Sequence, residues 1–461
     1  MFFRIDCKLE IKLPKKLIND TVKEMIYGFL YRSVKVDYIP HDKNEIIIGE
    51  PSYINYEGES AYKVTEKGVY ISGKDEKSLL TALFMVLQEI EPICLEEGKE
   101  ELRLLICEKQ LAPKIERRMI HFCLFPKIPL SSYRKLIRLA GVMGITHIIL
   151  EFWGTLKYQS LKELAWKNLS FSKEEIASLL KEMRELLIEP IPMLNHFGHA
   201  TQSRMCNGKH VVLDQNPRLA TLFSPDGWWW RFDKKEVKKL LKDLRQELID
   251  LFGEGEFFHL GMDESFSYPT DIDSSKALGA FLKELCEEVK AQGRIPMLWG
   301  DMFLHEPTLG IGKATGYEGN CPSAETAELL INALPQDAIV CDWQYFVKES
   351  PWKSVKYFVE KGIKTAICPW QDYDGVKSGI KTAIEYSCHS FIQTTWHTVF
   401  MHGNISSLLK VYYELFGINK TVPKIDSALY NASLLRKIWF ADGDYEKSGW
   451  VKVDVRGELT E

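Results

Sequence analysis

Short apolar runs recur along the chain from residue 118 onward, and segments with helical spacing of apolar residues separate them. The eight runs are residues 118–125, 147–153, 189–199, 257–264, 294–302, 338–345, 364–373 and 390–398. Residues 172–187, SKEEIASLLKEMRELL, are typical of the intervening segments. Eight strands alternating with helices predict a parallel sheet that closes into a (β/α)8 barrel, in the α/β class. The alternative, an open doubly wound sheet, normally has a glycine-rich phosphate turn after an early strand, and the sequence has none.

The chain before the barrel has a different pattern. Strands are expected at 44–51 and 61–75, the latter a hairpin turning at Lys67 and Gly68, followed by a helix at 77–90 and one more strand within 94–113. We therefore expect three parts: a small α/β domain at 1–113, the catalytic barrel at 114–420, and a C-terminal helix and tail at 421–461 packed on the barrel. The long connection at 200–233 should lie over the barrel mouth or brace it.

Composition narrows the classes of partner. The 461 residues are 45% hydrophobic and 27% charged with a net charge of −5, as in an ordinary soluble globular protein, so nucleic acid is not an expected partner. No apolar run approaches the length of a membrane span, and no signal peptide is recognisable. The ten cysteines show neither metal spacing nor a disulfide framework, so a cytoplasmic location is expected, although a processed secreted form would look the same. A homodimer is a further hypothesis.

No metal or other cofactor is expected. His196 and His199 in HFGH could suggest a metal pair, but no third ligand stands at a diagnostic spacing.

A barrel carries its active site at the C-terminal ends of its strands, and these ends are rich in aromatic and acidic residues. In chain order the residues there are Glu151, Trp153, His199, Asp263, Glu264, Trp299, Asp301, Trp343, Tyr345, Trp370, Asp372, Tyr373, Trp396 and His397. One tryptophan in such a place could simply fill the barrel top. Five of the twelve, with carboxylates between them, favour a pocket whose rings stack on a sugar and whose acids bind its hydroxyls.

Asp263 and Glu264, in EFFHLGMDES at 256–265, are the most specific feature. Neighbours on a regular strand point to opposite faces, so both can enter one pocket only if the chain turns there. Two close carboxylates push their pKa values apart, so that one keeps a proton while the other is charged. Glycosidic cleavage needs such a combination of proton donor and anion. The alternative is an acidic pair that caps the next helix.

Adjacent acids are poorly placed to be a general acid and an opposing nucleophile, because those roles lie on opposite sides of the scissile bond, about 5 Å or more apart. They suit a substrate whose own 2-acetamido group attacks the anomeric carbon. One acid then protonates the leaving oxygen, and the other orients the amide and stabilises the oxazolinium.

HLGMDES resembles the His-x-Gly-x-Asp-Glu motif of glycoside hydrolase family 20, the β-N-acetylhexosaminidases. PMLNHFGHA at 192–200, PMLWGDM at 296–302, DWQY at 342–345 and TTWHT at 394–398 are similar to strand-end segments of that family. RMIHFCLF and HIILEFWG look closer to the hexosaminidase D-like branch than to the lysosomal enzymes. The resemblance extends over nearly the whole chain and implies an α/β domain followed by a barrel.

The resemblance implies roles for individual residues. Glu264 would be the general acid/base and Asp263 the residue that holds the acetamido group, with His199 and His259 in support. Trp299, Trp343 and Trp396 would line the −1 sugar site. Either Tyr373, which we prefer, or Tyr345 would bind the acetamido oxygen. Arg118, or the adjacent Arg117, would grip sugar hydroxyls. Glu151, Asp301 and Trp370 complete the candidate substrate-binding residues.

Three departures from the family pattern affect sugar recognition. Met262 stands where many relatives have glycine, the first strand lacks an expected Asp, and no hydroxyl-binding Glu follows Trp396. The choice between N-acetylglucosamine and N-acetylgalactosamine is therefore open.

Three functions are weighed. The first is an exo-acting, retaining β-N-acetylhexosaminidase acting on a glycan or glycoconjugate with a terminal N-acetylhexosamine. The second is a barrel glycosidase with a protein nucleophile, Glu151 or Asp301, opposite Glu264. The third is a catalytically silent carbohydrate-binding barrel. The segment GWWWRFD at 227–233 is either an aromatic platform for a second sugar or packing for the long loop.

Overall fold

The computed structural model describes residues 1–6, 8–31, 34–96, 99–125, 128–152, 154–166, 168–201, 211–396, 405–418, 433–438, 452–453 and 459–460. The chain divides into two compact units. The first consists of residues 1–112, 134–143 and 424–461, and the second of residues 113–133 and 144–423. The predicted boundary at 113/114 lies within a residue of this division, whereas 424–461 groups with the first unit.

The first unit contains two sheets. The strands are β1 (Phe2–Ile5), β2 (Leu9–Pro14), β3 (Val36–His41), β4 (Glu45–Gly49), β5 (Ser60–Val64), β6 (Gly68–Gly73), β7 (Glu91–Glu96), β8 (Lys99–Leu105) and β9 (Cys107–Leu111). Six form a sheet in the order β3-β2-β4-β6-β5-β9, and three form a sheet in the order β1-β8-β7. The predicted hairpin at 61–75 is confirmed as β5 and β6. The prediction of a single strand within 94–113 is wrong, because three strands cover this region.

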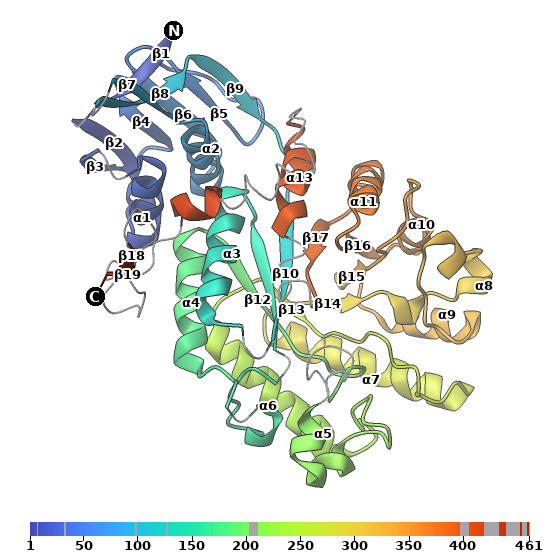
Figure 1. Ribbon diagram of the computed structural model, residues 1–461. Coiled ribbons are helices and arrows are strands. Elements are labelled where there is room, and N and C mark those ends of the chain that lie inside the picture. Colours follow the sequence, from blue (N-terminus) through green and yellow to red (C-terminus); the bar gives the residue numbers. More distant parts are fainter. Residues whose placement is uncertain are drawn as a thin grey trace. The chain divides into compact units, whose positions relative to one another are not determined.

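Two longer helices accompany these sheets: α1 (Asp20–Phe29) and α2 (Glu76–Gln88), with the short η1 (Lys15–Leu17) before them. The Asn19 side chain accepts a hydrogen bond from the Val22 N–H, and Asp75 accepts one from the Ser78 N–H, so each long helix has an N-cap. Ten consecutive residues of α2 are buried, from Ser78 to Leu87. The helix packs on β5 and β6 (Figure 1).

The second unit is built on a closed, eight-stranded parallel barrel, as predicted. Its strands are β10 (Arg118–Leu124), β11 (His147–Phe152), β12 (Glu189–Met193), β13 (Phe257–His259), β14 (Ile295–Trp299), β15 (Ile339–Asp342), β16 (Lys364–Ile367) and β17 (Ser390–Thr394). Each falls within one predicted run, and all eight end before that run does. Most candidate site residues therefore lie in the loops just beyond the strands.

Helices follow the strands of the barrel along the chain (Figure 1). They are α3 (Leu130–Val142), α4 (Lys173–Glu185), α6 (Lys235–Phe252), α7 (Ile272–Ala291), α9 (Ala324–Ala333), α10 (Lys353–Glu360), α11 (Tyr373–Glu385) and α13 (Ile405–Phe416). Shorter elements in the loops are η2 (Lys162–Leu164), α5 (Val211–Gln215), η3 (Pro217–Leu222), η4 (Asp301–Phe303), α8 (Glu306–Leu309) and η5 (Lys313–Thr315). Among the described helices, none combines the length and apolarity needed to cross a membrane.

A two-residue period places side chains inside the barrel. The interior core consists of Met119, Ile149, Ile191, Met193, Phe257, Met297, Trp299, Ile339, Cys341, Trp343, Ala366, Cys368 and Ile392. Counting on by twos from these positions predicts that His121, Glu151, Asn195, His259 and Asp301 also face inward. The barrel therefore changes from an apolar interior to a polar, aromatic one towards the strand C-termini.

The C-terminal region is described only in part. The predicted helix at 424–440 is helical at 433–438, and its other residues lie outside the described ones. Beyond it, β18 (Lys452–Val453) pairs with β19 (Leu459–Thr460).

Candidate active site

The chain turns sharply where β13 ends, as the sequence required for both acids to share a pocket. Gly261, Met262 and Glu264 have φ values of +74°, +83° and +48°. Positive φ is strained for a side chain such as Met or Glu, and such strain is concentrated at functional sites. A Cβ at Gly261 would lie 2.0 Å from Asn195 Oδ1, so only glycine fits there.

The third barrel strand supplies a matching turn. His199 has φ +52°, and Gly198 before it packs against the main chain of the acid pair. A Cβ on Gly198 would lie 1.8 Å from the Asp263 carbonyl oxygen. The two loops therefore fit together only because glycine occupies both Gly198 and Gly261.

The His199 side chain joins the two acids. Its Nε2 lies 2.8 Å from Glu264 Oε2 and 3.4 Å from Asp263 Oδ2. The Asp263 residue is only 3% exposed, whereas the Glu264 side chain is 29% exposed. The sequence prediction that the two carboxylates share one site is consistent with this geometry: a buried acid and a more accessible one, bridged by an imidazole.

The Asp301 side chain holds Glu264 in place through a hydrogen bond to the Glu264 main chain. Asp301 Oδ2 accepts hydrogen bonds from the Glu264 N–H at 2.9 Å and from Asn320 Nδ2 at 2.7 Å, and Oδ1 accepts one from Trp343 Nε1 at 3.0 Å. Burial raises the pKa of Asp301 to about 6, and the charge of Glu264 acts in the same direction, while these donors oppose the rise. Both oxygens face protein donors, so Asp301 positions the site.

Tyr345 belongs to the aromatic wall, and the charges of both acids act on its hydroxyl. Its ring stacks on Trp343, with centroids 5.0 Å apart, and lies 5.4 Å from the Trp370 ring. Burial raises the pKa of the Tyr345 hydroxyl well above its usual value, and the charges of Glu264 and Asp263 add to the rise. The hydroxyl is therefore within electrostatic reach of both acids.

Tyr373, the tyrosine preferred from the sequence, is held differently. It is the first residue of α11, and its hydroxyl donates to Glu414 Oε1 at 2.8 Å. Burial and this carboxylate raise the pKa of Tyr373 to about 12. Asp372 accepts the Gly375 N–H and caps the same helix, so both residues act at a helix start. The geometry favours Tyr345 over Tyr373.

The strand-end tryptophans form a layered wall. Trp299 is fully buried in the barrel core, and its ring lies 5.4 Å from that of Trp396, which is partly exposed. Trp343 is 3% exposed, and Trp370, partly exposed, donates to the Thr395 carbonyl oxygen at 3.3 Å. Trp299 and Trp343 thus lie at the floor, and Trp370 and Trp396 lie nearer the opening.

Sequence reasoning named Glu151 but missed the two buried side chains that hold it beneath this wall, His121 and Asn195. Glu151 is 2% exposed. Its Oε1 accepts a hydrogen bond from Asn195 Nδ2 at 2.8 Å, and its Oε2 lies 3.0 Å from His121 Nε2. The His121 ring lies 4.8 Å from the Trp396 ring. The signal that could have found His121 and Asn195 is the inward two-residue period that they share with Met119 and Met193.

Arg118 is not part of the site, which corrects the sequence prediction. It is the first residue of β10, at the opposite end of the strand from the acids. Its Nε donates to the Gly144 carbonyl oxygen at 2.9 Å, and its Nη1 donates to the carbonyl oxygens of Ile115 and Glu116. An arginine that starts a barrel strand serves the N-terminal face, because parallel strands all begin there. Arg117 pairs at 3.6 Å with Glu256, which precedes β13.

Two other buried histidines support the strand ends. His196 Nδ1 lies 2.7 Å from the Leu194 carbonyl oxygen, and Arg245 Nη1 lies 3.1 Å from His196 Nε2. Burial lowers the pKa of His196 to about 3, and the Arg245 charge acts in the same direction. His259 Nδ1 accepts the Gly261 N–H at 3.1 Å, and burial lowers its pKa to about 3 as well. Both rings are therefore neutral, and His259 stabilises the turn that carries the acids.

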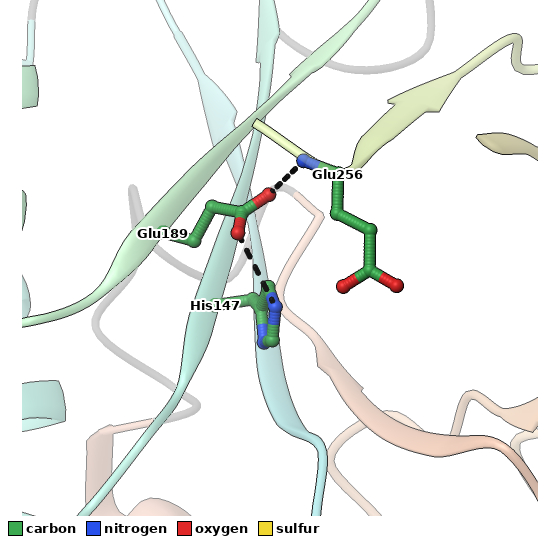
Figure 2. A group of neighbouring side chains, drawn as sticks. All are labelled: His147, Glu189 and Glu256. Atoms are coloured by element: carbon green, nitrogen blue, oxygen red, sulfur yellow. Dashed lines mark hydrogen bonds and ion pairs between the residues drawn. The ribbon is translucent and has the colours of Figure 1, made fainter. Parts of the chain in front are cut away.

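One group of side chains within the described residues has metal-ligating atoms close together. His147, Glu189 and Glu256 offer atoms within 4.8 Å of one another, at or just before the starts of β11, β12 and β13. Figure 2 shows Glu189 between the His147 ring and the main-chain N–H of Glu256. Burial raises the pKa of Glu189, and the Glu256 N–H and the charges of Arg294 and Arg184 oppose that rise. Arginines already supply positive charge here, at the barrel end remote from Asp263 and Glu264.

Two strand-end residues named from the sequence, Trp153 and His397, lie outside the described residues.

Comparisons with known proteins bear on the fold. No family model and no curated protein matches the sequence. Among solved structures, a glycoside hydrolase family 20 exo-β-N-acetylglucosaminidase from Vibrio harveyi, in complex with N-acetylglucosamine, is similar with a TM-score of 0.65 and 12% identity. The match covers 95% of this chain and 75% of that one.

Two Streptomyces structures are also similar. The family 20 β-N-acetylhexosaminidase of Streptomyces coelicolor A3(2) matches with a TM-score of 0.66 and 13% identity, over 95% of this chain and 92% of that one. A mutant Streptomyces plicatus β-hexosaminidase in complex with its product N-acetylglucosamine matches with a TM-score of 0.65 and 13% identity, over 94% and 92%. At such identities the likeness is one of fold: this chain has the (β/α)8 fold of solved family 20 structures, in agreement with the resemblance seen in its motifs.

Proposed function

We propose that this protein is an exo-acting, retaining β-N-acetylhexosaminidase that removes a terminal N-acetylhexosamine by substrate-assisted hydrolysis. The observation that carries the proposal is the geometry of the Asp263–Glu264 turn. Two neighbouring carboxylates, bridged by His199, lie at the C-terminal end of a barrel strand, with Tyr345 and a tryptophan wall beside them. The fold shared with family 20 structures, two of which hold N-acetylglucosamine, supports the same substrate class.

The first step uses the more exposed acid as proton donor. Glu264 protonates the glycosidic oxygen while the C1–O bond breaks, and the leaving group departs as an alcohol. The carbonyl oxygen of the 2-acetamido group bonds to C1, giving an oxazolinium ion. Asp263 accepts the amide N–H and stabilises the positive charge, and the Tyr345 hydroxyl donates to the acetamido oxygen, which orients it for attack.

The second step reverses the proton transfer. The Glu264 carboxylate takes a proton from a water molecule that attacks C1, the oxazolinium ring opens, and the acetamido group is restored with the configuration at C1 retained. His199, 2.8 Å from Glu264 Oε2, can donate a hydrogen bond to the carboxylate that exists between the two steps. Asp301 keeps Glu264 in place through its main-chain N–H.

The hypothesis of a protein nucleophile loses support from the contacts of its two candidates. Both Glu151 oxygens are engaged, by His121 and Asn195, and both Asp301 oxygens accept protein N–H groups. The two residues are 2% and 1% exposed. An attacking carboxylate must reach the anomeric carbon, and these two are occupied below the surface of the site. The intact acid pair argues against a silent binding barrel.

Hydrolysis of three 4-nitrophenyl β-glycosides tests the proposal: those of N-acetylglucosamine, N-acetylgalactosamine and glucose. We expect turnover of at least one acetamido sugar and a rate at least about 10³-fold lower for the glucoside, which lacks the internal nucleophile. Comparable turnover of the glucoside would indicate a protein nucleophile, and binding of the acetamido sugars without turnover of any substrate would indicate a silent barrel.

A further inference from the structure

The segment GWWWRFD contains three consecutive tryptophans with different surroundings. Trp230 is 1% exposed, donates to the Asn195 carbonyl oxygen at 2.9 Å, and packs 4.4 Å from the Phe223 ring. Trp229 lies 5.1 Å from the Tyr268 ring in an aromatic cluster. These two rings pack the long loop. The role of the third tryptophan, Trp228, is not accounted for by this packing.

Trp228 lies against the proposed general acid. Its indole N–H donates to the main-chain carbonyl oxygen of Glu264. Its ring lies 5.0 Å from the His199 ring, and His199 Nε2 in turn contacts the Glu264 carboxylate. Trp228 is therefore fixed beside both the main chain and the side-chain partner of Glu264, and it is itself partly exposed.

Phe266 extends this aromatic surface outward. It follows Glu264 by two residues, its ring lies 5.8 Å from the Trp228 ring, and 64% of it is exposed. In the described part of the second unit, the only other exposed large apolar side chains are Phe346 and Ile384. Phe266 and Trp228 together form an aromatic surface beside the loop that carries the acid, and such a surface suits stacking on a ligand.

The roles of the two acids indicate which part of the substrate this aromatic surface faces. Asp263, nearly buried, lies on the interior side, where the reacting sugar must sit if the acetamido group is to reach it. Glu264 is the more exposed acid and must contact the glycosidic oxygen, which joins that sugar to the leaving group. The leaving group therefore extends outward from Glu264, the acid beside which Trp228 and Phe266 lie.

Resting on the proposed function, we propose that Trp228 and Phe266 form the subsite for the leaving group, and that the site selects substrates whose leaving group is itself a ring. A pyranose offers a C–H face that stacks on aromatic rings, whereas a simple alkyl alcohol offers little surface. The substrate class is thus an oligosaccharide with a terminal N-acetylhexosamine linked to another sugar.

A comparison of two substrates with similar alcohol leaving groups tests the subsite. One is the β-1,4-linked dimer of N-acetylglucosamine, and the other is methyl β-N-acetylglucosaminide. We expect the wild type to have the higher kcat/KM for the dimer. In Phe266→Ala the ratio of the two kcat/KM values should fall roughly fivefold to tenfold, the size of an aromatic stacking contact.

Further variants separate stacking from general damage. Trp228→Ala should also lower the ratio, whereas Trp228→Phe should keep it, because the ring is retained while the N–H to Glu264 is lost. Ile384→Ala, which removes an exposed apolar side chain from the outer helix α11, should alter neither kcat/KM value.

A binding measurement removes any dependence on rate. In the Glu264→Gln background the dimer should bind more tightly than N-acetylglucosamine, and adding Phe266→Ala should reduce that difference roughly fivefold to tenfold. An active wild type whose ratio and affinity difference are unchanged in Phe266→Ala and Trp228→Ala would overturn the subsite alone. A wild type inactive on both substrates would overturn the proposed function, and the subsite with it.

Discussion

Charged side chains are arranged differently at the two ends of the barrel strands in the second unit. At the N-terminal end, Arg118 donates to three carbonyl oxygens, Arg294 donates to the Phe257 carbonyl oxygen, and Glu189 accepts the Glu256 N–H. At the C-terminal end, two carboxylates lie side by side on a strained turn, with a single imidazole between them.

The difference shows which charges stabilise the fold and which are kept for chemistry. Buried charge at the N-terminal end is matched by partners that neutralise it or satisfy its hydrogen bonds, as stability requires. At the other end, Asp263 and Glu264 repel each other, and positive φ values at Met262, Glu264 and His199 add backbone strain. Strain and closely placed like charges at one end of otherwise similar strands are the mark of a site that acts on a ligand.

Replacing the proton donor should have the largest effect. Glu264→Gln keeps the shape of the side chain but cannot protonate a leaving oxygen, so kcat/KM for a sugar leaving group should fall about 10³-fold. With a 2,4-dinitrophenyl leaving group, which departs without protonation, the loss should be much smaller. Equal losses for both leaving groups would mean that Glu264 is not the acid.

Removing the charge that faces the amide should come next. Asp263→Asn should lower kcat by about 10²-fold, because the transition state loses a stabilising anion, while the affinity for N-acetylglucosamine changes little. Stopped assays and calorimetry on the same preparation measure the two quantities. A loss of sugar affinity that fully accounts for the lower activity would place Asp263 in ground-state binding only.

The two tyrosines provide a matched pair. Tyr345→Phe should lower kcat about tenfold, because the donor to the acetamido oxygen is lost. Tyr373→Phe, which breaks the bond to Glu414 at the start of α11, should cost about 1 kcal/mol of stability and leave kcat within twofold. The reverse pattern would restore Tyr373 as the acetamido ligand.

Acid should destabilise the protein through His196. Its folded pKa of about 3 is below the unfolded value of 6.5, so its contribution to stability is present above pH 6.5 and is lost as pH falls towards 3. The slope is about 1.4 kcal/mol per pH unit in this window. Denaturant unfolding at several pH values should show a shallower decline for His196→Gln, although that variant is less stable at pH 7. Parallel declines would show that His196 does not titrate as described.

The smallest effect is expected at the N-terminal end of the strands. Glu256→Gln removes a half-exposed partner of Arg117 and should change stability by less than about 1 kcal/mol and kcat/KM by less than twofold. It is also the matched control for Glu264→Gln, a carboxamide at the other end of the same strand. A large loss of activity would break the contrast between the two ends.

The barrel could be predicted from the sequence because its eight strands and intervening helices differ so clearly in period. The strand ends were less well predicted, because inward-facing residues continue the two-residue pattern into the loops. Trp343 and Tyr345 follow Cys341 at that spacing although β15 ends at Asp342. The same spacing favours Tyr345 over Tyr373, because Tyr373 is the first residue of α11, directly after its N-cap Asp372.

The acid pair was predictable from the residues alone, because Asp263 and Glu264 are adjacent in sequence and need only a turn to meet. The support of His199 was expected only from the family resemblance, and the Asp301 bond to the Glu264 N–H was not expected, because both contacts join distant loops. Arg118 was misplaced because a motif was matched without its position in the strand: a residue that starts β10 cannot reach the opposite face. His121 and Asn195 were missed because they lie in apolar runs that resemble one another in the sequence.

The central claim is that the substrate's acetamido oxygen attacks the anomeric carbon. Stepwise fluorination of the N-acetyl methyl group, in a series of otherwise identical aryl β-glucosaminides, weakens that oxygen as a nucleophile and changes the size of the group little. If the claim holds, log kcat of the wild-type protein falls steeply with each fluorine. A kcat that stays level across the series would contradict it.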